Sequence, residues 1–336
     1  MPSVAARGHT TEKIEEVCGL VTGFAGYAFC KAHSPAYGVE AYQSAWLKRN
    51  YPAEFMAAVL TNGKGFYDPL VYVLESYRLG LKFLPPTVNE SGPMFTVQGR
   101  AIRVPLTRTK GLTDRTIKRL LAERQRGAFT SLADFHGHVM PSPEELDAMI
   151  RAGGFDKFGE TRTRQFWQAQ QLQRADSKGG NLEFNFDGAK DRVSDFFAEH
   201  SGLLREPTRR ERLETETELF GYAVSGHPLE LFDAIAWDTY CPVSRLGEHI
   251  GEEVVACGLV VEQRTHHQIT GEPMKFLTLA DWTGMVETEL FAQTYKNYGL
   301  ATVRYPVLEV AARVEPFENG RGFSLRVLRA GKPRTK

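Results

Sequence analysis

The chain has 336 residues, 42% of them hydrophobic and 24% charged, and its 41 basic and 41 acidic side chains balance to a net charge of zero. This composition is typical of a soluble protein with two or three domains. No hydrophobic run approaches the ~18 residues that a membrane helix needs, the N-terminus has no hydrophobic signal segment, and the four cysteines form no CxxC pair. We therefore expect a cytoplasmic protein with reduced thiols, without membrane contact and without a metal site.

The neutral total conceals two basic blocks separated by an acidic one. Residues 101–175 hold 13 basic and 8 acidic side chains, and residues 254–336 hold 11 and 8. Residues 176–253 hold only 8 basic side chains against 17 acidic ones. Basic blocks attract nucleic-acid phosphates whatever the base sequence, although an excess of this size also occurs in ordinary domains. The pattern favours nucleic-acid binding by the two basic blocks. It argues against nucleic-acid binding by the acidic block between them.

Helical periodicity interrupted by glycine and proline dominates residues 1–100. Pro52 begins one predicted helix, and a hydrophobic stripe over residues 70–77 forms another that ends at Gly80. Three aromatic side chains fit a further helical stripe, and core packing explains them better than DNA contact: Tyr42, Trp46 and Phe55.

Residues 101–175 begin with a predicted helix-hairpin-helix. The turn Lys110-Gly111-Leu112-Thr113 precedes a helix that Asp114 can cap, although the usual second glycine is replaced by Thr113. Backbone N–H groups at such a turn can hold a DNA phosphate without reading a base. An ordinary helix-loop-helix with a solvated basic face explains this segment equally well. The candidate DNA-binding residues of this unit are Lys110, Gly111, Thr113, Arg115, Lys118 and Arg119.

A second hairpin is predicted a little further along. A capping box at Ser142 starts a helix that ends at Gly153, and basic residues follow the turn. The candidate DNA-binding residues here are Gly153, Arg162 and Arg164. Two packed hairpins would contact both strands of a duplex, and this pairing favours DNA binding over a merely solvated face. Residues 176–253 are predicted to be an acidic linker with one connecting helix over residues 209–222.

From residue 254 the hydrophobic period changes from helical to two. Five strands are predicted with a short helix between the third and fourth, at residues 254–261, 274–280, 285–291, 306–314 and 323–328. This is the strand order of an oligonucleotide-binding barrel. We therefore expect a multi-domain α+β protein whose N-terminal two-thirds are mainly helical and whose C-terminal part is a five-stranded barrel of the OB type.

Single-stranded DNA on such a barrel would stack on aromatic rings and meet basic side chains. The candidate residues are Lys275, Trp282, Arg313 and Arg326. Five aromatic side chains are candidates for stacking: Phe276, Trp282, Phe291, Tyr295 and Phe323. At least half of these five are instead expected to fill the core of the barrel.

The most specific motifs are FAGYAFCKAHSPAY and AYQSAWLKRNYPAEFMAAVL, within residues 24–60. Together with LGLKFLPPTVNESGPMFTV, KGLTDRTIKRLLAERQRGAFTSLADF, AMIRAGGFDKFG and LFGYAVSGHPLELF, they closely resemble bacterial DNA polymerase III alpha subunits, the C-family polymerases. The resemblance covers nearly the whole chain, and the segment GFY hints at the error-prone branch. It implies that the chain holds the end of the fingers domain (1–100), a tandem helix-hairpin-helix domain (101–175), a connecting segment (176–253) and an OB-fold (254–330).

The resemblance also implies roles for Lys31 and His33, which would face the incoming nucleotide or the primer–template phosphates. A lysine is a point charge for phosphate and a histidine can donate a hydrogen bond, although a purely structural role is the alternative for His33. A short clamp-binding motif is common in the family, and its place here holds Asn181–Phe186, which departs from the glutamine-led pattern. Sliding-clamp binding is thus a possible partnership.

The resemblance places the Mg²⁺-binding aspartates of the complete polymerase in a palm region upstream of this chain. Two-metal phosphoryl transfer needs a cluster of carboxylates around two ions, whereas residues 1–100 contain Asp68 as their only aspartate. We therefore expect no catalytic residue and no cofactor in this chain, which should be inactive alone and could need a palm-containing partner. Its expected function is to grip primer–template duplex and single strand during replication or error-prone repair. The alternatives are a free-standing DNA-binding accessory protein and an inactive remnant of a truncated gene.

Overall fold

The computed structural model describes most of the chain: Thr10 and residues 12–13, 15–19, 33–63, 65, 67–177, 205–268, 271–317 and 320–336. Lys31, the side chain of His33 and the segment Asn181–Phe186 lie outside the described residues. The chain divides into two compact units, residues 1–55 and residues 56–336. No helix among the described residues is both long and hydrophobic enough to cross a membrane.

The first unit contains α3 (His33–Asn50) and the start of α4 (Pro52–Asn62), which begins at the proline as predicted. The expectation that Tyr42 and Trp46 pack in a core is wrong, because 71% and 48% of their surfaces are exposed. The hydrophobic residues of α3 are spread around the helix and do not form one stripe, so no single face could bury them.

The second unit begins with a helix and a small sheet. The carboxylate of Asp68 accepts the N–H of Leu70 at 2.8 Å and caps α5 (Pro69–Arg78), and Gly80 follows the helix with a φ of +73°. The sheet has the order β1-β3-β2, formed by β1 (Lys82–Leu84), β2 (Thr96–Gln98) and β3 (Ala101–Arg103). β1 runs parallel to β3, whereas β2 runs antiparallel to it.

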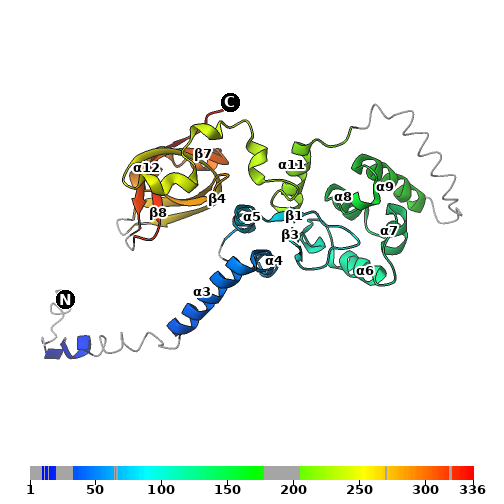
Figure 1. The fold of residues 1–336 in the computed structure, drawn as a ribbon, viewed down its shortest axis with the longest axis horizontal. Helices are drawn as coiled ribbons and strands as arrows, with labels where there is room; N and C mark the ends of the chain where they lie inside the picture. The colour runs from blue at the N-terminus through cyan, green and yellow to red at the C-terminus, as the bar shows by residue number, and fades with distance from the viewer. Residues whose placement is uncertain are drawn as a thin grey trace. The chain divides into compact units, whose positions relative to one another are not determined.

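The predicted hairpin region is a cluster of helices (Figure 1). Its core includes three phenylalanine side chains. Phe135 lies edge-on to both Phe129 and Phe155, with ring centroids 5.0 Å apart in each pair. The elements are η1 (Leu106–Arg108), α6 (Asp114–Arg124), α7 (Leu132–Val139), α8 (Pro143–Arg151), η2 (Asp156–Phe158) and α9 (Arg162–Ser177). The capping box at Ser142 is confirmed. The predicted cap of α6 is wrong by one residue, because Thr113 has the extended backbone of a cap and Asp114 is already helical.

Residues 205–253 connect this region to the barrel. They contain α11 (Arg209–Phe220) and three short 3₁₀ helices, η3 (Pro228–Phe232), η4 (Trp237–Thr239) and η5 (Val243–His249). Thr208 and Glu211 form a capping box at the start of α11, and Gly221 ends the helix with a φ of +89°. The connecting helix is therefore confirmed, with an end two residues earlier than predicted.

The C-terminal part is a closed five-stranded barrel with the order β4-β5-β6-β8-β7, which confirms the predicted class. Its elements are β4 (Glu253–His267), β5 (Pro273–Ala280), β6 (Met285–Leu290), α12 (Ala292–Tyr298), α13 (Ala301–Arg304), β7 (Val307–Pro316) and β8 (Phe323–Gly331). α12 packs against β5 and β8 (Figure 1). The core is built from valine, leucine and alanine, and none of the five aromatic residues considered for it is fully buried. The expectation that half of them fill the core is wrong, because the interior of a barrel this small is already occupied by aliphatic side chains.

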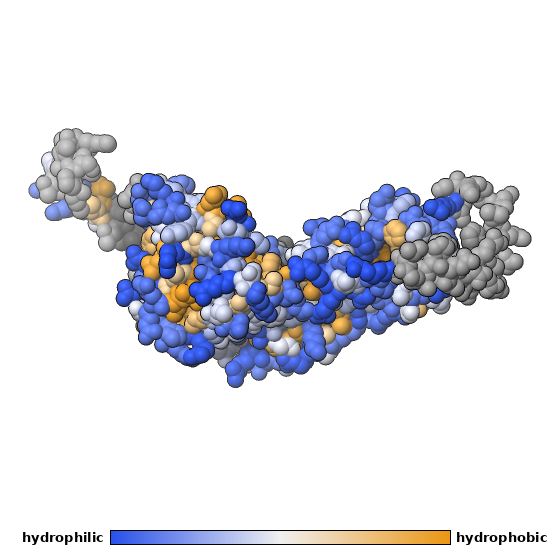
Figure 2. All heavy atoms as spheres, turned by 90° about the horizontal axis from the view of Figure 1, so that it is seen from above, coloured by the Kyte–Doolittle hydropathy of each residue, from blue (hydrophilic) through white to orange (hydrophobic). Residues whose placement is uncertain are grey.

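The barrel shares a hydrophobic core with α5. Val71 and Leu74 of α5 belong to one buried cluster with Leu259, Ala280 and Val307 of the barrel strands. On the face drawn in Figure 2, hydrophobic side chains gather in small patches among hydrophilic ones. The barrel is thus attached to the helical part by side-chain packing as well as by the chain itself.

Candidate nucleic-acid interface

The first hairpin has the backbone of a glycine turn, but two of its N–H groups are already used. Gly111 has a φ of +91°, which only glycine adopts without strain. The N–H of Lys110 donates to the carbonyl of Leu219 at the end of α11, at 3.0 Å. The N–H of Thr113 donates to Glu145 Oε1 at 2.9 Å. These two amides are therefore not available to a phosphate in this structure.

Glu145 binds the ends of two helices at once. Besides Thr113, its carboxylate accepts from the hydroxyl of Thr116 at 2.8 Å and from the N–H of Ser142 at 2.9 Å. Burial raises the pKa of Glu145, but the hydrogen bonds from Ser142, Thr113 and Thr116 outweigh burial and hold it below the ordinary value. A permanent anion thus lies at the positive ends of α6 and α8. Sequence reasoning identified the capping box but missed this second contact.

The basic side chains of the first hairpin remain exposed. Lys110, Arg115 and Lys118 point to solvent, and none has an ion-pair partner among the described residues. Arg119 is half-buried, and its Nε donates to the carbonyl of His138 at 2.8 Å. Three exposed cations on one helix and its turn can neutralise phosphates through charge alone.

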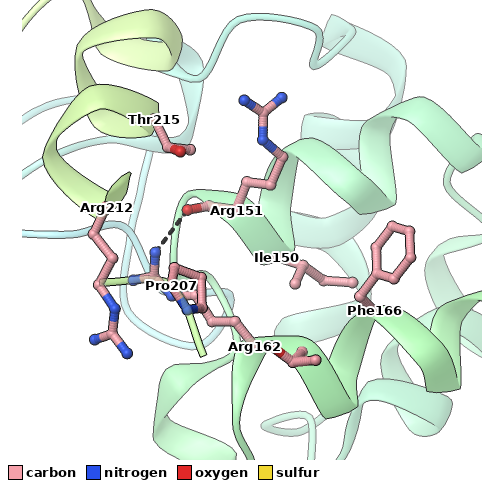
Figure 3. Close-up of a pocket in the computed structure, with 8 residues that line it drawn as sticks. Ile150, Arg151, Arg162, Phe166, Pro207, Arg212 and Thr215 are labelled. Atoms are coloured by element: carbon pink, nitrogen blue, oxygen red, sulfur yellow. Dashed lines mark hydrogen bonds between the residues drawn. The ribbon is translucent and has the colours of Figure 1, made fainter. Parts of the chain in front are cut away.

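Arg162 in the second hairpin is a structural residue. It is 9% exposed, and its guanidinium bonds Asp156 through Nε and Nη2 at 3.0 and 2.7 Å. Its Nη1 donates to the carbonyl of Arg151 at 2.7 Å (Figure 3). A Cβ at Gly153 would fall 2.4 Å from Nη2, so the glycine is needed to admit the guanidinium. The guanidinium of Arg162 is therefore engaged inside the protein, and Gly153 provides the space for it.

Arg164 is half-buried in the first turn of α9. Its Nε lies 3.8 Å from Oε1 of Glu160, and Glu160 precedes the first turn of α9. The second hairpin consequently offers fewer free cations than the first, and its turn amides are also used: Gly153 donates to Ile150 and Gly154 to Met149.

In the barrel, two candidate residues are engaged inside the protein. Lys275 has the same strand parity as the core residue Leu277, is 5% exposed, and donates from Nζ to Thr302 Oγ1 at 2.9 Å. Burial lowers its pKa. Trp282 is 45% exposed, but its indole stacks on His227 with centroids 4.6 Å apart. One aromatic face is therefore covered by the connecting segment.

Arg313 and Arg326 lie side by side on the outer surface of β7 and β8, where they are register partners. The guanidinium of Arg326 lies 4.9 Å from the ring centroid of Phe291, and its Nη1 is 3.4 Å from Glu315. Arg313 donates to the carbonyl of Gly251 at 3.0 Å. Arg326 against an aromatic ring, with Arg313 as its neighbour on the next strand, forms a suitable contact for a single strand.

The described residues include no group of three or more histidine, cysteine, aspartate or glutamate side chains placed to hold a metal ion. Two-metal phosphoryl transfer needs a carboxylate cluster of that kind.

We compared the sequence of this chain with those of known proteins. The family model described as a helix-hairpin-helix motif matches residues 80–165, which include both turns. The DNA polymerase III subunit alpha of Deinococcus radiodurans is 34% identical over 315 residues. This chain is homologous to part of the DNA polymerase III alpha subunit. The match to the Deinococcus polymerase III alpha subunit covers 86% of this chain and 23% of that protein.

Two further polymerase III alpha subunits have similar identity. That of Neisseria meningitidis serogroup B is 32% identical and covers 96% of this chain and 29% of that protein. That of Aquifex aeolicus is 30% identical and covers 87% of this chain and 24% of that protein. The chain thus spans about a quarter of the length of these relatives. The likeness extends through helices, connecting segment and barrel, because a single alignment covers most of the chain.

Proposed function

We propose that this chain is a DNA-binding part of a DNA polymerase III alpha-like protein, which grips primer–template duplex through its helix-hairpin-helix region. The observation that supports it most is the set of exposed cations on the first hairpin that have no ion-pair partner among the described residues: Lys110, Arg115 and Lys118. They lie within the residues matched by the helix-hairpin-helix model. Side-chain cations bind the backbone of a duplex without base preference.

Duplex binding tests this function. A fluorescently labelled duplex should bind the full chain, and Arg115→Ala with Lys118→Ala should weaken binding by a similar factor for every base sequence. The slope of log K against log[salt] should fall by ~0.9 for each phosphate that the variant no longer neutralises. Arg126→Ala is the control for loss of an exposed cation, because Arg126 is also exposed but is paired with Glu123. Absence of duplex binding at low salt would refute the proposal.

We further propose that the barrel contacts single-stranded template through Arg313, Arg326 and Phe291. Nucleotidyl transfer would be supplied by Mg²⁺-binding carboxylates in a palm region, on this protein or on a partner chain. Primer extension by the chain alone should therefore be undetectable, and extension by the chain alone would contradict this division of labour. Sliding-clamp binding through residues 181–186 is testable by pull-down with Phe184→Ala and Phe186→Ala together.

A further inference from the structure

Two large hydrophobic side chains at α13 are exposed to solvent. Leu300, at the N-cap position, is 78% exposed and Val303 is 73% exposed, the highest values for large hydrophobic residues in the described part of the chain. Leu300 already has helical backbone angles, and its carbonyl accepts the N–H of Val303 at 3.3 Å. Residues three apart on a helix lie on the same face. Leu300 and Val303 therefore form one exposed hydrophobic surface, which we call the α13 patch.

The rest of this segment packs inward. Tyr298, Ala301 and Tyr305 pack against the barrel core, and Thr302 is 3% exposed. The opposite arrangement would suit the stability of the barrel better, because burying leucine or valine is favourable and a buried hydroxyl needs a hydrogen-bond partner. Here the threonine is buried, while the leucine and the valine face water. The outward position of the α13 patch is thus typical of a surface that binds another molecule.

A buried lysine fixes α13 in place. Lys275 Nζ donates to Thr302 Oγ1 at 2.9 Å, and Thr302 Oγ1 donates to the carbonyl of Gly299 at 2.7 Å. Lys275 Nζ also lies 5.8 Å from the ring centroid of Tyr295 in α12. A Cβ at Gly299 would lie 2.6 Å from that ring, so the glycine is needed for the close turn between α12 and α13. The α13 patch is therefore held in one position, which lowers the entropy cost of binding a partner.

The surface around the α13 patch is cationic. Residues 291–308 contain Lys296 and Arg304 but no aspartate or glutamate. Both side chains are exposed, and neither has an ion-pair partner among the residues whose placement is described. A hydrophobic centre with charged residues at its edge is the usual composition of a protein–protein interface. Because the charges here are positive, the complementary edge of a partner would be acidic.

Two other occupants fit this surface less well. Single-stranded DNA gains affinity by stacking bases on aromatic rings, and Leu300 and Val303 have none. A second copy of this chain in a symmetric dimer would bring identical surfaces together, so the cations of one copy would face those of the other. Such like-charge contacts are unfavourable at an interface. A peptide with both hydrophobic and acidic side chains matches both parts of the surface.

We propose that the α13 patch docks a short segment of a partner protein in which acidic residues flank at least one large hydrophobic side chain. The hydrophobic side chain would lie against Leu300 and Val303, and the carboxylates would pair with Lys296 and Arg304. This interaction goes beyond DNA binding and uses none of the residues to which we assign DNA contacts. The barrel would thus join a partner protein to a chain that binds DNA.

A peptide library tests this proposal, because the partner is defined by its chemistry. Random peptides displayed on phage are selected on the immobilised full chain, and the enriched peptides are synthesised with a fluorescent label. We expect them to combine aspartate or glutamate with phenylalanine, leucine or tryptophan. Leu300→Ser with Val303→Ser should weaken their binding by at least about tenfold, measured by fluorescence anisotropy. Ile250→Ser is the matched control and should bind like wild type, since Ile250 is also an exposed hydrophobic residue but lies at the end of η5.

The charges give a second readout that does not depend on the hydrophobic substitutions. Lys296→Gln with Arg304→Gln should weaken binding of the same peptides and make it less dependent on salt, because salt screens exposed ion pairs. Unchanged affinity in either double variant would overturn the proposal. Selection of basic peptides, or of no peptide at all, would overturn it as well.

The same variants identify the other occupants. A concentration-dependent dimer of the wild-type chain, lost in Leu300→Ser with Val303→Ser, would show by analytical ultracentrifugation that the patch binds a second copy. Weaker binding of a labelled oligonucleotide by that variant would assign the patch to the single-strand surface. Either result would contradict docking of an acidic partner segment.

Discussion

The Oε1 atom of Glu145 accepts both the backbone N–H and the hydroxyl of Thr113, at 2.9 and 2.7 Å. Glu145 also closes the capping box of α8, so this one carboxylate joins the starts of α6 and α8. A glycine at position 113, as in the usual two-glycine turn, would supply the N–H but not the hydroxyl. The residue that departs from the motif is therefore the one that completes the contact.

Removing this carboxylate should destabilise the hairpin region. In Glu145→Ala four donors of Thr113, Thr116 and Ser142 are left without a charged acceptor in a partly buried place. We expect the free energy of unfolding to fall by about 2–4 kcal/mol, measured by urea denaturation. Glu144→Ala is the control, because Glu144 is exposed beside the same cap. A Glu145→Ala protein as stable as the control would contradict the role assigned to the carboxylate.

The same group should make stability depend on pH in a defined direction. The folded-state pKa of Glu145 lies below its ordinary value, so its contribution is complete above the unfolded-state pKa and is lost as the pH falls through the folded one. Glu145→Gln lacks this contribution. The stability difference between wild type and Glu145→Gln should therefore be constant at neutral pH and shrink in acid. A difference that grows in acid would mean that the carboxylate is not held as an anion.

The ring of His227 should titrate unusually low. It stacks on Trp282 at 4.6 Å and lies 5.0 Å from the ring of Tyr77, and burial lowers its pKa to about 4. In Trp282→Ala one face of the imidazole meets water, so the pKa should rise towards 6.5, as followed by NMR of the ring protons. Because the unfolded chain binds the proton first, wild-type stability should also fall as the pH drops from about 6.5 to 4. A wild-type pKa of His227 near the ordinary histidine value would show that the stack is open.

Single-strand binding should distinguish two basic residues of the barrel. Arg326→Ala should weaken binding of a labelled oligonucleotide and lower its salt slope by ~0.7, because Arg326 is exposed beside Phe291. Lys275→Met should leave binding unchanged, since Lys275 is buried against Thr302. Weaker binding by Lys275→Met, with its melting temperature preserved, would show that this lysine does reach the strand.

The barrel illustrates what could be read from residue order. Alternating hydrophobic residues in β5, β6 and β7 predicted strands within one or two residues of their observed ends, because a strand half-buried in a barrel must alternate. The same alternation also indicated that the side chain of Lys275 points into the barrel, because Lys275 lies two positions from the inward-facing Leu277. Its positive charge favoured an outward assignment, and only the position of Thr302 on α13 shows how the charge is accommodated.

The sequence by itself determined most of the helices, the capping box at Ser142, the succession of strands and helix along the barrel, and the resemblance to polymerase III alpha, because these depend on neighbours along the chain and on long motifs. Tertiary structure alone decided which cations stay free. Arg115 and Arg162 look alike in the sequence, yet one is exposed and the other is bonded to Asp156. Likewise, no pattern links Thr113 to Glu145 or Thr163 to Glu206. A hydrogen bond between residues 32 or 43 positions apart depends on how the segments pack, and packing here places Glu145 against Thr113 and Glu206 against Thr163.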